Sequence, residues 1–257
     1  MSVILETRGL TKTFGAVIAA AGIDFAVEDD SVVGLIGSNG AGKTTFVNLV
    51  TGYLKPTSGA IRYRGQDITS LQPRQVTRLG VCRSFQIPQV FDTLTAFENL
   101  LVGLGIAARH GRRPGPRAHE AAEVAADDML RRFGLDRFRG VPAAVLPEGV
   151  RKLLDIAMVL VVKPQILLLD EPTSGVSSEE KFALMDLVLG AIRKDRVTVL
   201  FVEHDMEIVR RYAQRVAAFY EGRIIADGPT AQVLENAEVR RYVVGGDPAP
   251  LPPERAC

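Results

Sequence analysis

Residues 37–44 read G-S-N-G-A-G-K-T and fit the pattern G-x-x-x-x-G-K-[ST], a glycine-rich loop that cradles phosphate groups. The glycines allow a tight turn in which successive backbone N–H groups face one concavity. An apolar run at 31–36 predicts a strand before the loop, and residues 45–50 predict a helix after it. A helix that begins at such a concavity adds the positive end of its dipole. This context predicts a nucleotide site rather than a chance glycine-rich turn.

The polar residues of this loop have expected roles. Lys43 supplies a positive charge for the β- and γ-phosphates, and the hydroxyl of Thr44 can bind Mg²⁺. The residues expected to bind the phosphates of a nucleotide through this loop are Gly37, Ser38, Asn39, Gly40, Ala41, Gly42, Lys43, Thr44 and Thr45.

A second apolar run, 166–169, ends in two carboxylates, Asp170 and Glu171. Asp170 can reach Mg²⁺, and Glu171 can polarise a water molecule aligned with the γ-phosphate. The alternative is a strand followed by an acidic turn, which the phosphate loop upstream makes less favourable. His204 follows the next apolar run and is expected at the same sheet edge, although a lone histidine is more often structural.

One amide side chain and one aromatic side chain are further candidates for the nucleotide site. Gln86 can bind the metal or the attacking water through its amide, but a lone glutamine is usually a surface residue. Phe14 can stack on adenine, but taken alone it is more typical of a core.

Composition excludes several classes of protein. The chain of 257 residues has a formal net charge of +1, which gives no case for nucleic acid as a partner. No apolar run approaches the ~18 residues of a membrane span, and the N-terminus lacks the pattern of a signal peptide. Two distant cysteines, Cys82 and Cys257, give no disulfide framework and favour a reducing cytosol.

The remaining pattern predicts a mostly parallel α/β core with an antiparallel strand layer and a helical insertion. Strands are expected within 3–30, at 59–65, 80–84, 166–169 and 197–202, and in a hairpin at 217–226. Helices are expected at 71–80, over much of 92–160, at 177–193 and near 231–234. Ser177 and Glu180 have the spacing of a capping box. A basic segment at 109–117 is expected to be a solvated loop, with contact to acidic lipid as a weaker alternative.

Together these residues resemble the ATP-binding-cassette (ABC) ATPases over nearly the whole chain. Residues 37–45 match the Walker A motif of that family, and 166–171 match its Walker B motif with the catalytic glutamate. Gln86 corresponds to the Q-loop glutamine, His204 to the switch histidine and Phe14 to the adenine-stacking aromatic residue. The resemblance implies ATP hydrolysis in which Glu171, His204 and Lys43 are catalytic, and in which Thr44, Gln86 and Asp170 bind Mg²⁺.

The resemblance also implies the fold and its division. We expect the ABC ATPase fold, a P-loop NTPase core of the RecA-like type with an antiparallel β subdomain and an α-helical subdomain. A single domain is expected over 1–246, with the helical subdomain at about 87–160 and a C-terminal helix at about 229–245. Residues 247–257 are rich in proline and are expected to form a disordered tail.

Within the family, residues 11–21, 83–101 and 228–244 resemble the ATPase subunits of importers for branched-chain or other hydrophobic amino acids or related small carboxylates. This implies a second homologous ATPase in a heterodimer, two membrane permease subunits, an extracytoplasmic solute-binding protein, and a cytoplasmic location on the inner face of the cell membrane. Exporter ATPases for lipid or lipopolysaccharide are close relatives. ABC proteins that act as nucleotide switches without transport are a further alternative, although they usually carry two cassettes in one chain.

The chain departs from the family at the signature motif, which is usually L-S-G-G-Q and acts on the partner's nucleotide. The matching residues are Leu146, Pro147, Glu148, Gly149 and Val150. The serine hydroxyl is absent, Pro147 lacks a backbone N–H, and Glu148 places a carboxylate near a phosphate. Two interpretations remain open. Either Gly149 and the helix terminus suffice, or this half-site is impaired and a partner with an intact signature completes the competent site.

In ATPases of this type a permease helix docks beside the Q-loop. The residues that match this docking surface are 87–91 and 95–100. An apolar cluster in this place is equally compatible with the core of the helical subdomain.

Overall fold

The glycine-rich loop leaves an interior strand of a six-stranded sheet whose order is β10-β9-β3-β8-β7-β6. This strand, β3 (Val32–Gly37), pairs in parallel with β8 (Thr198–Val202) and β9 (Arg215–Tyr220), and the loop leads into α1 (Lys43–Val50). The structure is a computed structural model that describes residues 2–108 and 118–245. The α/β P-loop core predicted from the sequence is confirmed.

The other strands of this sheet bring several chain segments to one edge. β7 (Ile166–Asp170) lies between β8 and β6 (Val81–Ser84) and is parallel to both, while β10 (Arg223–Pro229) is antiparallel to β9. The register aligns Val202 with Leu35 and with Asp170, and Ser84 with Leu169. Because parallel strands point the same way, the segments that follow β3, β6, β7 and β8 start side by side.

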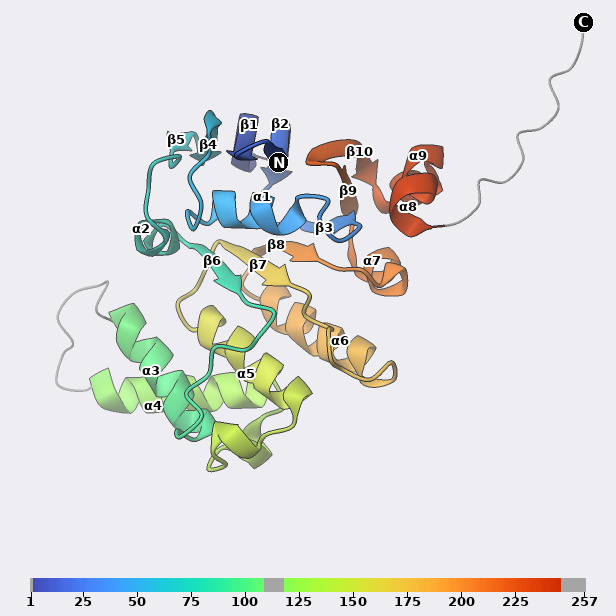
Figure 1. Cartoon of the computed structure of the whole chain (residues 1–257). Helices are drawn as coiled ribbons and strands as arrows, with labels where there is room; N and C mark the ends of the chain where they lie inside the picture. Colours follow the sequence, from blue (N-terminus) through green and yellow to red (C-terminus); the bar gives the residue numbers. More distant parts are fainter. Residues whose placement is uncertain (1, 109–117, 246–257) are drawn as a thin grey trace, which may run out of the picture.

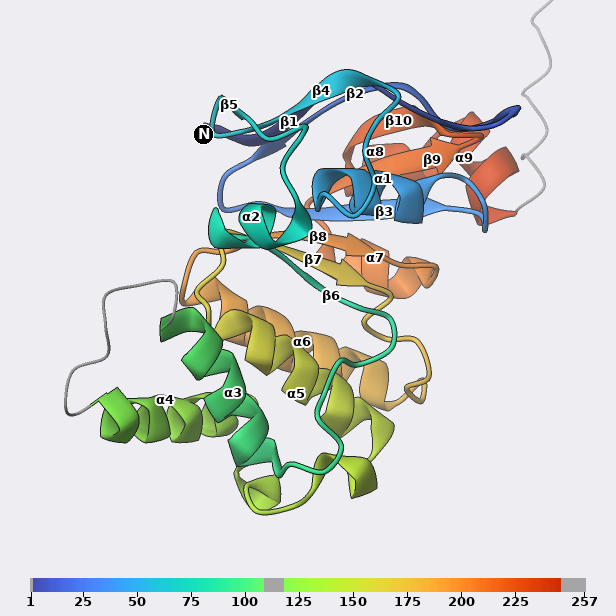
Figure 2. The same cartoon turned by 60° about the vertical axis from the view of Figure 1, so that its left-hand side comes forward.

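A second, antiparallel sheet covers one face of α1. Its order is β2-β1-β4-β5, formed by β1 (Val3–Phe14), β2 (Val17–Glu28), β4 (Ser58–Tyr63) and β5 (Gln66–Asp67). Figures 1 and 2 show α1 between the two sheets. Phe46 of α1 is fully buried there, with its ring 5.6 Å from that of Phe25 and 5.5 Å from that of Phe219. This aromatic contact fixes the helix that follows the phosphate loop between both sheets.

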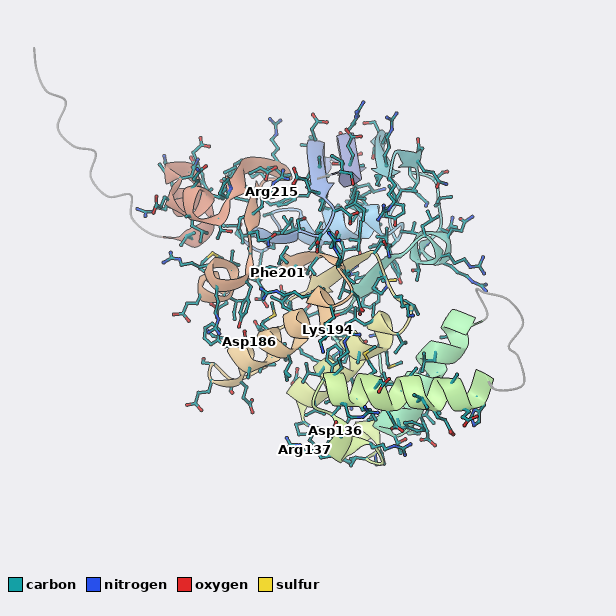
Figure 3. The ribbon with its side chains drawn as sticks, turned by 180° about the vertical axis from the view of Figure 1, so that it is seen from behind. Asp136, Arg137, Asp186, Lys194, Phe201 and Arg215 are labelled. Carbon is teal, nitrogen blue, oxygen red and sulfur yellow. The ribbon has the colours of Figure 1, made fainter. Side chains whose placement is uncertain are left out.

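Helices cover the other face of the central sheet (Figure 2). They are α3 (Ala96–Ala108), α4 (Ala118–Arg132), α5 (Glu148–Leu160) and α6 (Glu180–Arg193), with short turns η1 (Asp136–Phe138) and η2 (Ala143–Val145). Figure 3 shows the buried Phe201 of β8 above α6, which carries Asp186, while Asp136 and Arg137 lie at the far end of the helical layer. The remaining helices are α2 (Pro73–Arg78), α7 (Met206–Tyr212), α8 (Thr230–Glu235), α9 (Ala237–Val239) and η3 (Arg240–Val244).

Two predicted helices differ from the observed ones. The helix predicted at 177–193 begins at Glu180, although Ser177 Oγ still accepts from the backbone N–H of Glu180 at 3.3 Å. The single C-terminal helix expected at about 229–245 is instead three short helical segments. Asn236 interrupts it with an extended backbone (ψ 131°), and its side chain caps α9 by accepting from the N–H groups of Glu238 and Val239.

Other expectations fall outside the described residues. They concern the basic segment at 109–117 and the tail at 247–257. Within residues 2–108 and 118–245, no helix has the length and apolar character needed to cross a membrane.

Candidate active site

The phosphate loop folds around the ammonium group of Lys43. Its Nζ donates to the carbonyl oxygens of Gly37 at 2.6 Å and Ser38 at 3.0 Å. Gly42 has a φ of +104°, and a Cβ at this position would lie 2.6 Å from the carbonyl oxygen of Ala19 in β2. Glycine is therefore required at this position, because any side chain would push the loop away from the antiparallel sheet.

The loop forms one wall of a pocket of about 250 Å³. The lining comprises residues 39–45 of the loop together with Glu171 and His204. Burial lowers the pKa of Lys43, while the carboxylates of Glu171 and Asp170 oppose that change. Backbone N–H groups, one cationic side chain and a helix N-terminus thus converge on a space that suits an anion.

Glu171 is held between two side chains that the sequence places far apart. Gln86 Nε2 donates to Glu171 Oε2 at 2.8 Å, and His204 Nε2 lies 2.8 Å from Glu171 Oε1. The backbone of Glu171 has a φ of +49°, an unfavourable region for a residue with a side chain. Its N–H group donates to Val202 O at 3.0 Å, which ties this turn to β8. Three of the predicted site residues are therefore in direct contact.

A buried carboxylate, that of Glu203, stabilises the arrangement of Glu171 and His204. Glu203 is 3% exposed and accepts from the backbone N–H of Thr173 at 3.0 Å and from its hydroxyl at 2.7 Å. Burial raises the pKa of Glu203, and these hydrogen bonds oppose the increase. The contact joins the segment after β7 to the segment after β8, which positions Glu171 opposite His204.

Asp170 forms an ion pair that the sequence did not predict. Its carboxylate contacts the guanidinium of Arg83 in β6, and both side chains are more than nine-tenths buried. Arg83 Nη1 also donates to Asn48 Oδ1 of α1 at 2.5 Å. The one signal in the sequence was a charged residue inside the short strand 81–84.

Phe14 is not part of the pocket lining. It lies at the end of β1, 49% exposed, with Lys12 Nζ 5.1 Å from the ring centroid. The structure thus places this candidate outside the loop's own cavity, on the hairpin that joins β1 to β2.

The signature segment lies away from this pocket, at the start of α5. Pro147 is the residue immediately before the helix, and Glu148 is its first residue. The carboxylate of Glu148 packs against Gly175, where a Cβ would lie 2.5 Å from Glu148 Oε1. The side chain is directed at the loop that follows Glu171 in the same chain.

Lys152 connects α5 to the same loop. It is 5% exposed, and its Nζ donates to the carbonyl oxygen of Ser174 and, at 3.3 Å, to that of Glu171. Burial lowers the pKa of Lys152, while the carboxylates of Glu148, Glu203 and Glu171 oppose that decrease. Sequence reasoning missed this lysine because its position on an apolar helix gives no local pattern.

The two parts of the predicted docking surface differ in exposure. Ile87 is 74% exposed and Phe91 is 48% exposed. By contrast, Ala96, Phe97 and Leu100 are buried in the helical layer. The segment 95–100 therefore belongs largely to the core, the alternative that the sequence left open.

Residues 20–174 match the sequence profile of the ABC transporter family. The chain belongs to this family. This ABC cassette is 37% identical over 250 residues to the high-affinity branched-chain amino acid transport ATP-binding protein BraF of Pseudomonas aeruginosa, covering 94% of this chain and 98% of the relative. It is 34% identical over 249 residues to the corresponding LivG protein of Escherichia coli, with the same coverage.

Solved structures confirm the ABC ATPase fold. A crystal structure of the ADP conformation of MJ1267, an ATP-binding cassette of an ABC transporter, matches with a TM-score of 0.82 and 29% identity. The match covers 94% of this cassette and 98% of that chain. The fold and the family together establish the cassette as an ATPase.

Proposed function

We propose that this cassette is the ATP-hydrolysing subunit of a membrane importer for branched-chain amino acids, other hydrophobic amino acids or related small carboxylates. The relatives BraF and LivG, which it matches along almost their whole length, carry the transport part of the proposal. The placement of Glu171 between Gln86 and His204, beside the phosphate loop, carries the hydrolytic part.

The side chains around the pocket suit a magnesium–nucleotide complex. Lys43 and the N–H groups of the loop would bind the phosphates, and Phe14 would approach the adenine from the β1–β2 hairpin. Oxygen donors from Thr44, Asp170 and Gln86 would hold Mg²⁺, since this hard cation prefers oxygen ligands and keeps several from substrate and water. When bound, Mg²⁺ supplies positive charge that neutralises the phosphate oxygens.

Glu171 is proposed to orient the attacking water and accept its proton. Its carboxylate is fixed at both oxygens, so little reorganisation is needed when a water molecule replaces one of these contacts. His204 would then contact the γ-phosphate, and Lys43 would stabilise the charge that develops on it. The strained backbone of Glu171 keeps this geometry available in the free protein.

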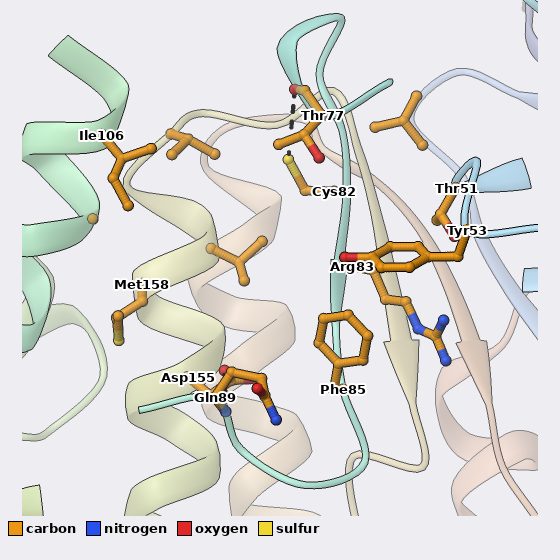
Figure 4. A pocket seen from close by; sticks show the side chains of 14 residues that line it. Thr51, Tyr53, Thr77, Cys82, Arg83, Phe85, Gln89, Ile106, Asp155 and Met158 are labelled. Atoms are coloured by element: carbon orange, nitrogen blue, oxygen red, sulfur yellow. Dashed lines mark hydrogen bonds between the residues drawn. The ribbon is translucent and has the colours of Figure 1, made fainter. Parts of the chain in front are cut away.

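The partners proposed are a second, non-identical ABC ATPase, two permease subunits and a solute-binding protein, with the cassette on the inner face of the membrane. The signature segment would act on the partner's nucleotide. A permease helix would dock at 87–91, where Ile87 and Phe91 are exposed. The adjoining cavity of about 230 Å³ lies between β6, α3 and α5, and its lining includes Tyr53, Phe85 and Ile106 (Figure 4).

Reconstitution tests the import proposal directly. The cassette is co-expressed with the permease subunits and partner ATPase, purified as a complex and placed in proteoliposomes with the binding protein. We expect ATP-dependent accumulation of radiolabelled leucine on the side that carries the cassettes, and its loss in Glu171→Gln with ATP binding retained. Substrate movement from the cassette side to the opposite leaflet would instead establish an exporter.

A second variant tests the docking surface. We expect Phe91→Asp to abolish uptake and leave nucleotide binding by the isolated cassette unchanged, because a charge at this exposed apolar position opposes contact with an apolar helix. Wild-type uptake by the variant would remove residues 87–91 from the interface.

A further inference from the structure

We infer that Arg83 is a positioning residue that links the groove beside the Q-loop to the carboxylate of Asp170. This groove is the cavity of about 230 Å³ whose lining includes Tyr53 and Phe85. The inference rests on the proposed roles of Asp170 as a magnesium ligand and of the groove as a docking site. It assigns to one buried guanidinium the task of holding the metal-binding carboxylate in place.

Three structural elements meet at this guanidinium. Arg83 belongs to β6, which leads to Gln86. Its Nη2 donates to Asp170 Oδ2 at the end of β7. Its Nη1 donates to Asn48 Oδ1 of α1, the helix that begins at the phosphate loop. The strands and helix that carry the Q-loop, the carboxylate and the phosphate loop are thus joined by one side chain.

The aromatic wall of the groove touches the same guanidinium. The ring centroid of Phe85 lies 4.8 Å from Arg83 Cζ, and the ring of Tyr53 meets that of Phe85 edge to face at 5.7 Å. Figure 4 shows the two rings next to each other, with the Arg83 side chain extending beside them. Tyr53 is 53% exposed, so a partner that enters the groove reaches this aromatic pair first.

Burial makes the ion pair sensitive to small displacements. The side chains of Arg83 and Asp170 are 8% and 9% exposed, so their attraction is little screened by water. Arg83 Nε is buried and has no hydrogen-bond partner within residues 2–108 and 118–245. The hydrogen bonds of the guanidinium therefore run through Nη1 and Nη2, and the ring of Phe85 packs against it. A shift of Phe85 alters how firmly Asp170 is oriented toward the nucleotide.

Metal affinity is the measurement that separates positioning from general stability. Binding of a fluorescent ATP analogue to the purified full-length cassette is titrated with Mg²⁺, and also measured in EDTA. Loss of a residue that orients a metal ligand typically weakens metal affinity by about 10–100-fold. We expect Arg83→Met to raise the Mg²⁺ concentration for half-maximal binding at least about tenfold, with unchanged binding in EDTA. Asn48→Ala and Phe85→Leu should produce smaller shifts in the same direction.

Arg215→Met is the matched control. Arg215 forms an ion pair with Asp227 and donates from Nη1 to the carbonyl oxygen of Ala26 in β2, at the junction of the two sheets (Figure 3). Its Mg²⁺ dependence should equal that of the wild type. If Arg83→Met does not fold, Arg83→Lys serves in its place, since lysine keeps the charge but lacks the fork that spans Asp170 and Asn48. It should shift the Mg²⁺ dependence.

The outcomes are separable. Wild-type Mg²⁺ dependence in Arg83→Met or Arg83→Lys, or equal weakening with and without Mg²⁺, overturns the positioning role. Wild-type behaviour of Phe85→Leu overturns the link to the groove. If the wild-type cassette binds the nucleotide without any Mg²⁺ dependence, the proposed magnesium site fails instead.

Discussion

Asp155 Oδ1 accepts a hydrogen bond from the backbone N–H of Gln89 at 2.9 Å. The contact joins α5, whose first turn contains the end of the signature segment, to the chain just after Gln86. Asp155 is 4% exposed. Burial raises its pKa from an ordinary 3.8 to about 6, while hydrogen bonds from the backbone of Gln89, the side chain of Ser84 and the backbone of Phe85 oppose the increase. A buried carboxylate thus connects the signature helix to the Q-loop.

Removing this charge should stabilise the protein at high pH. The carboxyl binds its proton more tightly in the folded state, so its contribution to the free energy of unfolding falls as pH rises from about 4 to about 6. Asparagine keeps the acceptor oxygen and carries no charge. We expect Asp155→Asn to unfold with a free energy higher by up to about 3 kcal/mol at pH 8, and by about half as much at pH 5. Urea titrations at the two pH values measure this, and an equal difference at both would contradict it.

Asn99 should be among the most sensitive positions of the helical layer. It is fully buried, and its Nδ2 donates to the carbonyl oxygens of Phe91 at 3.1 Å, Leu94 at 3.2 Å and Thr95 at 2.9 Å, while Oδ1 accepts from Phe91 N at 2.8 Å. Asn99→Ala leaves these groups unpaired and should lower the free energy of unfolding by about 2–4 kcal/mol.

The exposed neighbour Glu98 provides the comparison for this variant. Its carboxylate accepts from Thr95 at the start of the same helix. Glu98→Gln keeps an acceptor there and should change the free energy of unfolding by less than about 1 kcal/mol. A loss in Asn99→Ala no larger than that in Glu98→Gln would show that the buried amide network contributes little.

The nucleotide pocket could be predicted because its pattern is local. Residues 37–44 specify their own turn, and Asp170 and His204 each follow an apolar strand. Parallel pairing then brings these strand ends together without further information. Gln86 was singled out by the family resemblance, and the structure places it in contact with Glu171.

The buried polar contacts around the pocket could not be predicted in this way. Arg83 and Asp170 are 87 positions apart, and Asp155 and Gln89 are 66 apart. A single polar residue in an apolar run belongs to no periodic pattern from which its partner could be predicted. Its role appears only when the packing of α5, β6 and β7 is known, because desolvation then requires a partner for each buried charge.

Lys152 should affect turnover more than binding. Methionine has a similar length but cannot donate to the carbonyl oxygens of Ser174 and Glu171, so Lys152→Met frees the strained turn that holds the carboxylate. We expect kcat for ATP in the assembled transporter to fall roughly tenfold while KM is unchanged. Lys194→Met, at an exposed lysine after α6, is the control and should match the wild type. A higher KM with normal kcat would place Lys152 in nucleotide binding instead.

The signature segment leads to a prediction about the second nucleotide of the proposed ATPase dimer. Pro147 provides neither a hydroxyl nor an N–H group, and the carboxylate of Glu148 lies against Gly175. If these residues weaken contact with the partner's γ-phosphate, Pro147→Ser with Glu148→Gly restores the usual donors and removes the repulsion. We expect the double variant to raise the ATPase rate of the complex with a non-identical partner several-fold, which corresponds to a barrier lower by on the order of 1 kcal/mol.

Glu148→Gln removes the charge but not the proline and should give a smaller increase. Unchanged rates in both variants, measured in reconstituted complexes, would mean that Gly149 and the start of α5 already suffice.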